Sequence, residues 1–258
     1  MIVLPFHGRS APAQLGKEED EMKYWKITNQ SEKHYDMQYR TGLNVDVLPF
    51  YPYGDCEPGG IYYSDTTHIL AFLDTPSGPG KWIREVTLPE GDLAYENPGY
   101  PKKWKAHRVI LGERKEITAE VIEELLDHGA KIHPGGDLAL CHMAEAGRTD
   151  IVELLLNHGA DIHAWHDRAL SYAAAEGHTD TVELLLNHGA DIHAWHDRAL
   201  SYEAAEGHTD TVELLLDRGA DIHANNDCAL RWAAGSGHTD TVELLLNRGA
   251  HRQKMWGY

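Results

Sequence analysis

Apolar residues recur at helical spacing throughout the second half of the chain. Within the stretch Thr179–Gly189, the residues Val182, Leu185 and Leu186 stand at positions i, i+3 and i+4, with polar residues around them. This spacing places the three side chains on one face of a helix. A shorter apolar run, Arg168–Ala175, precedes it. The pattern predicts two helices joined by a turn, each with one buried face.

This helix pair is repeated at an interval of 30 residues. A Gly-Ala pair ends each copy, at 129–130, 159–160, 189–190, 219–220 and 249–250. Residues 161–190 and 191–220 differ only at Ala173/Glu203, Asn187/Asp217 and His188/Arg218. Self-similarity at this interval predicts a solenoid, in which each unit buries its apolar face against its neighbours. We predict four units, at 131–160, 161–190, 191–220 and 221–250, after a half-repeat at 116–130 that caps the stack.

The helix ends carry signals of their own. Asp167 is predicted to cap the first helix of its unit, Arg168–Ala175. The second helix is predicted to begin at Thr179 or Asp180, and Glu183 is placed to complete a capping box with Asp180.

The first half of the chain alternates between apolar and polar residues, as strands do. Residues 22–28, 59–64, 82–88 and 103–111 are predicted strands, separated by Gly and Pro turns. The first strand is expected at the edge of a sheet, and Asp65 or Thr66 is expected to cap a short helix over Thr67–Leu73. Residues 22–115 are therefore predicted to form an α+β domain, and the small and charged residues 1–21 a flexible leader.

Charge and cysteine content narrow the possible functions. The net charge is −18, and residues 116–258 hold 9 Lys and Arg against 25 Asp and Glu. An acidic solenoid repels phosphate backbones, so we expect the repeats not to bind nucleic acid. The negative charge either only keeps the protein soluble or attracts a basic protein partner.

No apolar run is long enough to span a membrane. Cys56, Cys141 and Cys228 are odd in number and far apart, which favours free thiols in a reducing compartment.

The repeat resembles the ankyrin repeat. The string Ala-Leu-x-x-Ala-Ala-x-x-Gly-His-x-x-x-Val-x-x-Leu-Leu-x-x-Gly-Ala-Asp-Ile, from Ala169 to Ile192, matches that family. The interval is shorter than the usual 33 residues, which implies a trimmed finger loop, and Arg168–Ser171 replaces the family's Thr-Pro-Leu-His. This version is similar to the ankyrin proteins of giant DNA viruses of amoebae, and residues 43–63 are similar to an uncharacterised domain of large viruses. The resemblance implies an all-α ankyrin solenoid over residues 116–250, with a concave face that holds a protein partner.

Aromatic and basic residues cluster at the predicted finger tips and on the outer side of the first helices. Trp, Tyr and Arg are the residue types enriched at binding hot spots. The alternative is that the aromatic side chains only pack between successive fingers. The candidate partner-binding residues are Trp165, His166, Arg168, Tyr172, Trp195, His196, Arg198, Tyr202, Arg231 and Trp232.

Histidine is abundant, with 12 of the 18 between residues 131 and 250. No cysteine or carboxylate joins His163 and His166, or their copies His193 and His196, at a constant spacing, so neither a metal site nor a cofactor is predicted. Protonation of this many histidines predicts a surface whose charge changes near pH 6.

Glu203 stands where the neighbouring units have Ala173 and Ala233. The helical pattern buries this position, and an unpaired buried carboxylate is strongly disfavoured. We expect alanine at this position to stabilise the fold unless Glu203 has a partner.

A catalytic site is expected, if anywhere, in the N-terminal domain. Gly60–Ser64 resembles the second motif of ADP-ribosyltransferases, in which a tyrosine on a strand stacks on the nicotinamide ring. The resemblance implies a catalytic glutamate, for which Glu85 and Glu96 are the candidates. No His or Arg stands near Tyr24–Thr28, where that family has its first motif.

The last unit is as apolar as those before it, so its outer face needs a cover. Either Met255, Trp256 and Tyr258 in the tail (residues 251–258) fold over that face, or the chain associates end to end.

The sequence as a whole predicts a non-enzymatic scaffold or adaptor that binds a protein partner in the cytoplasm. If the protein is viral, this is the cytoplasm of the host. An effector with an enzymatic N-terminal domain and a structural virion component are the alternatives.

Overall fold

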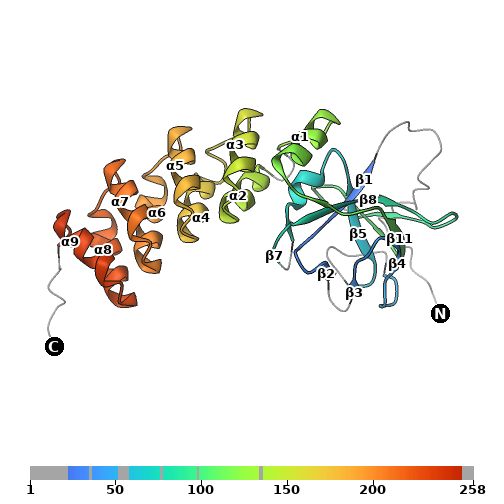
Figure 1. Ribbon diagram of the computed structural model, residues 1–258, viewed down its shortest axis with the longest axis horizontal. Coiled ribbons are helices and arrows are strands. Elements are labelled where there is room, and N and C mark those ends of the chain that lie inside the picture. The colour runs from blue at the N-terminus through green and yellow to red at the C-terminus, as the bar shows by residue number, and fades with distance from the viewer. Residues whose placement is uncertain are drawn as a thin grey trace, which may run out of the picture. The chain divides into compact units, whose positions relative to one another are not determined.

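The computed structural model describes residues 23–34, 37–51, 58–75, 78–97, 99–133 and 136–251. It divides into two compact units, with the division between Gly135 and Gly136. The N-terminal unit is rich in strands and the C-terminal unit is helical (Figure 1), which confirms the predicted order of an α+β part and an all-α part. The predicted leader, Cys56, and the tail residues Met255, Trp256 and Tyr258 lie outside the described residues.

An antiparallel sheet in the order β4-β11-β8-β1-β5-β10-β9 builds the N-terminal unit, and β12 also pairs with β8. The stretch Lys103–Leu111 supplies both β10 and β11, which only His107 separates. β10 pairs with β5, β11 pairs with β8, and β1 lies between β5 and β8. The sheet therefore closes on itself through one bent stretch of chain. The strands are β1 (Tyr24–Thr28), β2 (Lys33–His34), β3 (Met37–Gln38), β4 (Gly42–Val45), β5 (Ile61–Asp65), β6 (Asp74–Thr75), β7 (Gly78–Pro79), β8 (Trp82–Thr87), β9 (Tyr95–Asn97), β10 (Lys103–Ala106), β11 (Arg108–Leu111) and β12 (Lys115–Glu116).

The structure of this unit corrects three sequence predictions. β1 is predicted at an edge, but it is paired on both sides and its last four residues are buried. The single strand predicted over 103–111 is broken at His107, because its two halves pair with different partners. The helix predicted over Thr67–Leu73 is one 3-10 turn, η1 (Ile69–Phe72), in which Asp65 Oδ1 accepts a hydrogen bond of 2.9 Å from the His68 backbone N–H.

Aromatic and aliphatic side chains fill the core of this sheet. Tyr24 lies edge-on to Tyr63 and Trp104, with ring centroids 5.7 and 5.2 Å away. The buried core residues are Met37, Tyr39, Ile61, Tyr63, Val86, Ala94, Trp104, Ala106, Val109 and Leu111.

The helical unit is a row of helix pairs (Figure 1). First helices pack on first helices along the row, and second helices pack on second helices. Val182 and Leu185 are buried and Leu186 is half-buried, which confirms the predicted apolar face. The first helices are α2 (Leu138–Glu145), α4 (Arg168–Ala175), α6 (Ala194–Glu206) and α8 (Ala224–Ser236), and the second helices are α3 (Thr149–Asn157), α5 (Thr179–Asn187), α7 (Thr209–Asp217) and α9 (Thr239–Asn247).

Helix α1 (Ala119–Asp127), the predicted half-repeat, groups with the N-terminal unit. Its cap is Thr118, whose hydroxyl oxygen accepts a hydrogen bond of 3.4 Å from the Val121 backbone N–H. The capping box predicted for α5 is absent, since no side chain in the described structure caps this helix.

Polar contacts that recur from one repeat to the next join neighbouring units. Threonine hydroxyls bond between units at 2.6–2.7 Å, in the pairs Thr149–Thr181, Thr179–Thr211 and Thr209–Thr241. Arg218 reaches back to Glu183 and Asn187 of the preceding unit, at 2.6 and 2.9 Å. Arg248 makes the corresponding contacts with Glu213 and Asp217.

His188→Arg is expected to add one such bridge. His188 takes the position of Arg218, and Glu153 and Asn157 stand at the same intervals before it. An exposed bridge of this kind contributes about 0.2–1 kcal/mol and weakens with salt. We expect a small rise in the melting temperature at low salt that disappears in about 1 M NaCl, and Arg218→His should show the reverse. A gain that is equal at both salt concentrations would contradict this account.

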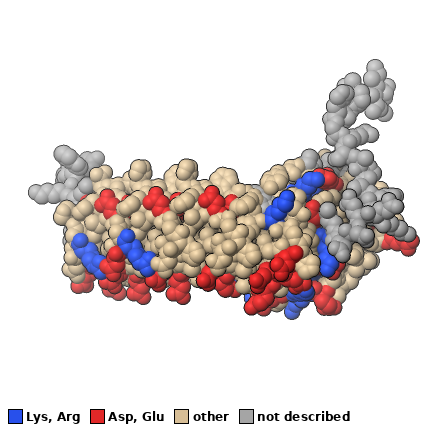
Figure 2. Space-filling view, turned by 90° about the horizontal axis from the view of Figure 1, so that it is seen from above, with Lys and Arg blue, Asp and Glu red and all other residues tan. Residues whose placement is uncertain are grey.

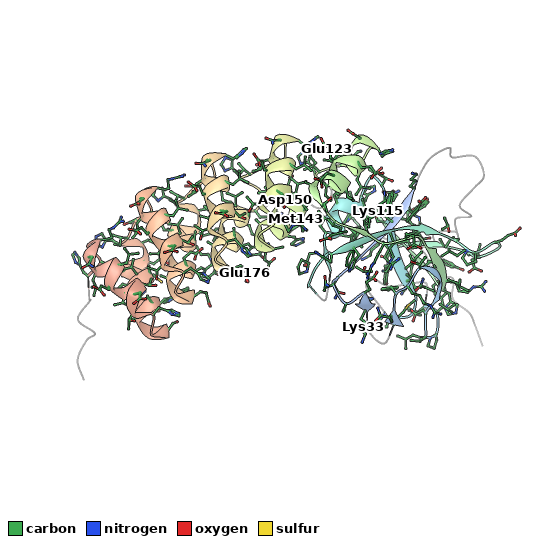
Figure 3. The ribbon with its side chains drawn as sticks, viewed as in Figure 1. Lys33, Lys115, Glu123, Met143, Asp150 and Glu176 are labelled. Carbon is green, nitrogen blue, oxygen red and sulfur yellow. The ribbon has the colours of Figure 1, made fainter. Side chains whose placement is uncertain are left out.

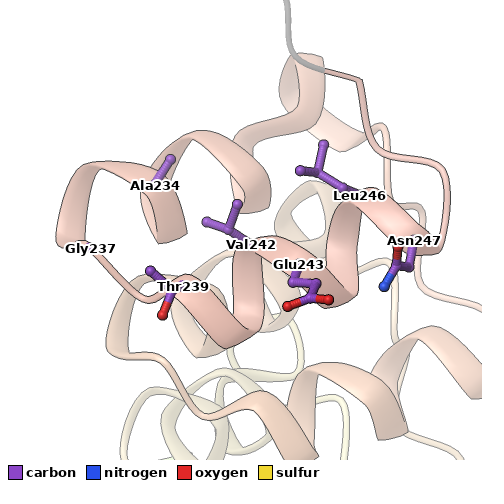
Figure 4. Close-up of a pocket in the computed structure, with 7 residues that line it drawn as sticks. All are labelled: Ala234, Gly237, Thr239, Val242, Glu243, Leu246 and Asn247. Carbon is purple, nitrogen blue, oxygen red and sulfur yellow. The ribbon is translucent and has the colours of Figure 1, made fainter.

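The outer face of the last unit forms an open hollow of about 480 Å³ (Figure 4). Val242 is only partly buried there and Ala234 is exposed, whereas Val212 and Ala204 at the preceding junction are fully buried. The expectation of an apolar outer face is therefore confirmed for the described residues. The hollow is lined by Ala234, Gly237, Thr239, Val242, Glu243, Leu246 and Asn247.

Candidate functional site

The tip of each finger is a left-handed turn. Trp165, His166 and Asp167 have φ angles of 55°, 59° and 55°, and the same conformation recurs in residues 195–197 and 225–227. Each non-glycine residue in this conformation costs roughly 1–2 kcal/mol, and Asn and Asp tolerate it best. The fourth unit carries Asn225-Asn226-Asp227 at this position. Only the second and third units place Trp and His in the strained turn.

The aspartate that ends each turn links one unit to the next. Asp167 is predicted to cap α4, but it has a left-handed backbone and its side chain makes no capping bond. Its Oδ1 instead accepts hydrogen bonds of 2.8 Å from the Asp191 backbone N–H and 3.0 Å from His163 Nδ1. Asp137, Asp197 and Asp227 accept the corresponding backbone bond at 3.3, 2.7 and 3.2 Å. The predicted cap is therefore wrong, and the residue is a link between repeats.

The two finger-tip tryptophans are about half exposed, at 50% for Trp165 and 49% for Trp195. Trp165 Nε1 donates a hydrogen bond of 2.7 Å to Gly136 O of the preceding finger. The ring of His166 meets Trp195 edge-on, with centroids 5.4 Å apart. Part of each indole thus packs between fingers, and the other part faces solvent.

Arginine and tyrosine side chains continue this surface along the first helices. The Arg168 guanidinium lies 5.6 Å from the Trp165 ring and 5.5 Å from the Tyr172 ring. Arg198 lies 5.9 Å from Trp195 and 4.8 Å from Tyr202, and its Nε donates a 2.6 Å hydrogen bond to the Tyr202 hydroxyl. These contacts fix the aromatic rings and the guanidinium groups in one surface.

The fourth unit extends this surface by one aromatic residue. Trp232 is 42% exposed and stacks on Tyr202 at 6.1 Å. Arg231 donates a hydrogen bond of 3.0 Å to Asn225 O instead, and its guanidinium contacts no described aromatic ring. The side chain of His196 also contacts no aromatic ring among the described residues. We call the surface formed by Trp165, His166, Arg168, Tyr172, Trp195, Arg198, Tyr202 and Trp232 the aromatic face.

Glu203 has a partner for only one of its two carboxyl oxygens. It is fully buried, and its Oε2 lies 2.9 Å from His208 Nδ1, while its Oε1 has no hydrogen-bond partner among the described residues. Burial raises the pKa of this carboxyl to about 9. Met143 takes the corresponding position in the first unit (Figure 3).

The residues of the proposed catalytic alternative are not brought together. Tyr62 alternates with the buried Tyr63 on β5, and the register pairs Tyr63, Trp104 and Glu96 on one face of the sheet. The side chain of Tyr62 therefore points to the face opposite Glu96, and Tyr63, which shares the face of Glu96, is buried against Tyr24 in the core. Glu85 is exposed on β8, two strands from β5, which is roughly 10 Å.

Metal-binding clusters and membrane-spanning helices are both absent from the described residues. No group of three or more His, Cys, Asp or Glu side chains in the described ranges is arranged to hold a metal ion. Nor does any described helix have the length and apolar content needed to cross a bilayer.

Comparisons with known proteins place the repeats in a family. A family model described as "Ankyrin repeats (3 copies)" matches residues 113–196 and 193–255, and so includes α1. One ankyrin repeat protein of Acanthamoeba polyphaga mimivirus is 34% identical over 127 residues, which cover 46% of this chain and 40% of that protein. A second from the same virus is 33% identical over 130 residues, 49% of this chain and 38% of that protein. The chain thus spans less than half the length of these two relatives. Because the family match covers more than half of the chain and agrees with the stacked helix pairs, the chain belongs to the ankyrin repeat family.

Proposed function

We propose that this protein is a scaffold or adaptor that binds a protein partner through the aromatic face. Ankyrin repeats are a general protein-interaction module, and the chain resembles viral members of the family. One observation carries the proposal: the second and third units hold Trp and His in a left-handed turn that the fourth unit builds from Asn-Asn. Strained backbone of this kind is concentrated at functional sites.

A purely structural role accounts poorly for these tryptophans. Asn225 Nδ2 donates to His196 O of the preceding finger at 3.3 Å, a contact similar to the one Trp165 Nε1 makes with Gly136 O. Asparagine therefore supplies a link between fingers with less backbone strain. What tryptophan adds is a large, half-exposed ring, and such rings beside arginine are the usual anchors of protein interfaces.

The binding mechanism follows from the rigidity of this surface. Stacked repeats, cation–π contacts and hydrogen bonds hold the side chains in place before a partner arrives, which lowers the entropy lost on binding.

A basic partner is a separate proposal, and it would bind the edge of the repeats along which Asp and Glu gather (Figure 2). Location in the cytoplasm, of the host cell if the protein is viral, is also part of the proposal. The described structure supplies no specific observation that favours an enzymatic effector or a virion component.

Conversion of both finger tips to the sequence of the fourth unit is expected to separate binding from stability. In the variant Trp165→Asn, His166→Asn, Trp195→Asn, His196→Asn, backbone strain falls while one hydrogen bond and part of the ring packing are lost. We expect a melting temperature within a few degrees of the wild type, or above it, together with loss of partner capture. Immobilised wild type and variant would be incubated with the same amoebal lysate, and the proteins retained would be compared by mass spectrometry.

A matched variant controls for surface location. Asp150→Asn, Asp180→Asn, Asp210→Asn, Asp240→Asn changes four exposed residues at the starts of the second helices. It should retain the proteins that the finger-tip variant loses. Loss of capture in the aspartate variant alone would assign the partner to the carboxylates at the starts of the second helices. A clear fall in the melting temperature of the finger-tip variant, with capture intact, would show that the tryptophans serve packing.

A further inference from the structure

The arginines in the described part of the helical unit fall into two groups. Arg148, Arg218 and Arg248 each have a carboxylate within 3.3 Å. Arg168, Arg198 and Arg231 form no ion pair with any described residue, although Asp and Glu greatly outnumber Lys and Arg in the repeats. The unpaired group lies on or beside the aromatic face.

Aromatic rings hold two of these guanidinium groups in place of carboxylates. The Arg168 guanidinium lies against the rings of Trp165 and Tyr172 and forms no hydrogen bond with any described residue. Arg198 contacts two rings in the same way and uses only its Nε as a hydrogen-bond donor. A guanidinium has five N–H donors in a planar fork that matches a carboxylate. The terminal N–H groups of both arginines therefore have no acceptor within the described structure, while ring contacts fix their position.

The spacing of the two arginines sets the spacing of the groups they would bind. They occupy equivalent positions on α4 and α6, which pack on each other as neighbouring first helices. Neighbouring helices lie roughly 8–10 Å apart. A peptide in the polyproline II conformation rises about 3.1 Å per residue with three residues per turn, so two of its side chains three residues apart lie on the same side of the peptide, about 9 Å apart.

We infer that the partner presents an acidic segment in the polyproline II conformation to the aromatic face, with two carboxylates three residues apart. One carboxylate binds Arg168 and the other binds Arg198, each through the free N–H groups. Apolar side chains of the segment lie on the exposed halves of Trp165 and Trp195. This inference rests on the proposed function and specifies the chemistry of the partner.

The charge distribution favours this occupant over two others. Three unpaired arginines lie on or beside this face, and they would repel the cationic side chains of a basic partner. A nucleic acid offers both phosphates and stacking bases, but its dense charge is repelled by the strongly acidic repeats. A segment with only two carboxylates is repelled much less, and each carboxylate can bind one of the two guanidinium groups.

Selection from a random decapeptide display library tests the inference without knowledge of the natural partner. Selection on the immobilised wild-type protein is expected to enrich peptides with Asp or Glu at positions i and i+3. The same selection on Arg168→Gln, Arg198→Gln should lose this enrichment. Arg218→Gln, Arg248→Gln makes the same change in charge at paired arginines and should keep it. For the best peptide, measured by fluorescence anisotropy, we expect about a tenfold loss of affinity for each unpaired arginine removed.

The outcomes separate the inference from the proposed function. Enrichment of Lys and Arg, no enrichment of acidic residues, or acidic enrichment that survives Arg168→Gln, Arg198→Gln would overturn the inference. If the selected peptides still depend on Trp165 and Trp195 in those cases, the proposed function stands. Tighter binding of a ten-nucleotide oligothymidylate than of the best peptide, lost in the same double variant, would replace the acidic segment with a nucleic acid.

Discussion

Glu203→Ala is expected to raise the melting temperature of the protein. Burial raises the pKa of this carboxyl from 4.5 to about 9, so the folded chain keeps a proton at pH 7 that the unfolded chain releases. This difference costs roughly 3 kcal/mol of stability at pH 7, since one pKa unit is about 1.4 kcal/mol. Alanine removes the cost and gives up the hydrogen bond to His208. We expect a net gain of about 1–2 kcal/mol, or roughly 3–6 °C.

The gain from Glu203→Ala should depend on pH in one direction. Between pH 4.5 and about 9 the folded wild type binds one more proton than the unfolded chain. Its stability relative to the variant therefore falls as the pH rises through this window. Thermal melts near pH 5, 7 and 8.5 should show a small gain at the first pH and the largest gain at the last.

The second repeat supplies a matched control for Glu203. Ala173 takes the equivalent position between nearly identical neighbours, and His178 corresponds to His208. Ala173→Glu should lower the melting temperature by a similar amount and with the opposite dependence on pH. Glu203→Gln should remove the dependence on pH while a buried polar group remains. A fall in the melting temperature of Glu203→Ala at pH 8 would show instead that Glu203 is ionised and paired with a protonated His208.

The sequence predicts the helical unit well because its determinants are local and repeated. The interval of 30 residues locates each pair, and helix Arg168–Ala175 is confirmed with both predicted ends. The second helix is confirmed from Thr179. Apolar periodicity within ten residues suffices for these predictions, since each helix contacts mainly its neighbours in the chain.

The left-handed finger tip is the main feature that this reasoning misses. Asp167 before a helix has the sequence signature of a cap, and no local pattern in Trp165-His166-Asp167 distinguishes a cap from a link to the next unit. The sequence of the fourth unit indicates the left-handed turn, because Asn225-Asn226-Asp227 consists entirely of residues that favour this backbone conformation. Comparison of equivalent positions among the repeats, rather than analysis of one repeat, would have predicted the turn.

The N-terminal unit is harder to predict because its determinants are distant in sequence. The strands themselves are confirmed near residues 24–28, 61–65 and 82–87. Their order depends on pairing between residues tens of positions apart, and the bend at His107 that closes the sheet has no signal of its own. Burial on both sides of β1, which includes Lys26, follows from this closure and not from the local pattern.

Asp197→Ala is expected to cause the largest loss of stability among single changes at the finger tips. The Asp197 side chain is buried, and its Oδ1 accepts hydrogen bonds of 2.7 Å from the Asp221 backbone N–H and 3.0 Å from His193 Nδ1. Alanine removes both bonds, leaves the Asp221 N–H without this acceptor, and tolerates the φ angle of 56° less well than aspartate. We expect a loss of about 3–4 kcal/mol, measured as the change in unfolding free energy in urea, and a melting temperature lower by roughly 10 °C.

Two further variants divide this loss between backbone strain and the lost link. Asp197→Gly accepts the left-handed backbone without strain but has no acceptor, so it should lose about 2 kcal/mol. Asp197→Asn keeps both the acceptor oxygen and the tolerance for positive φ, so it should lose about 1 kcal/mol or less. The expected order of stability is wild type, Asn, Gly, Ala. If Ala and Asn were equally stable, Asp197 would not link the third unit to the fourth, and the turn would have to be stabilised by its neighbours alone.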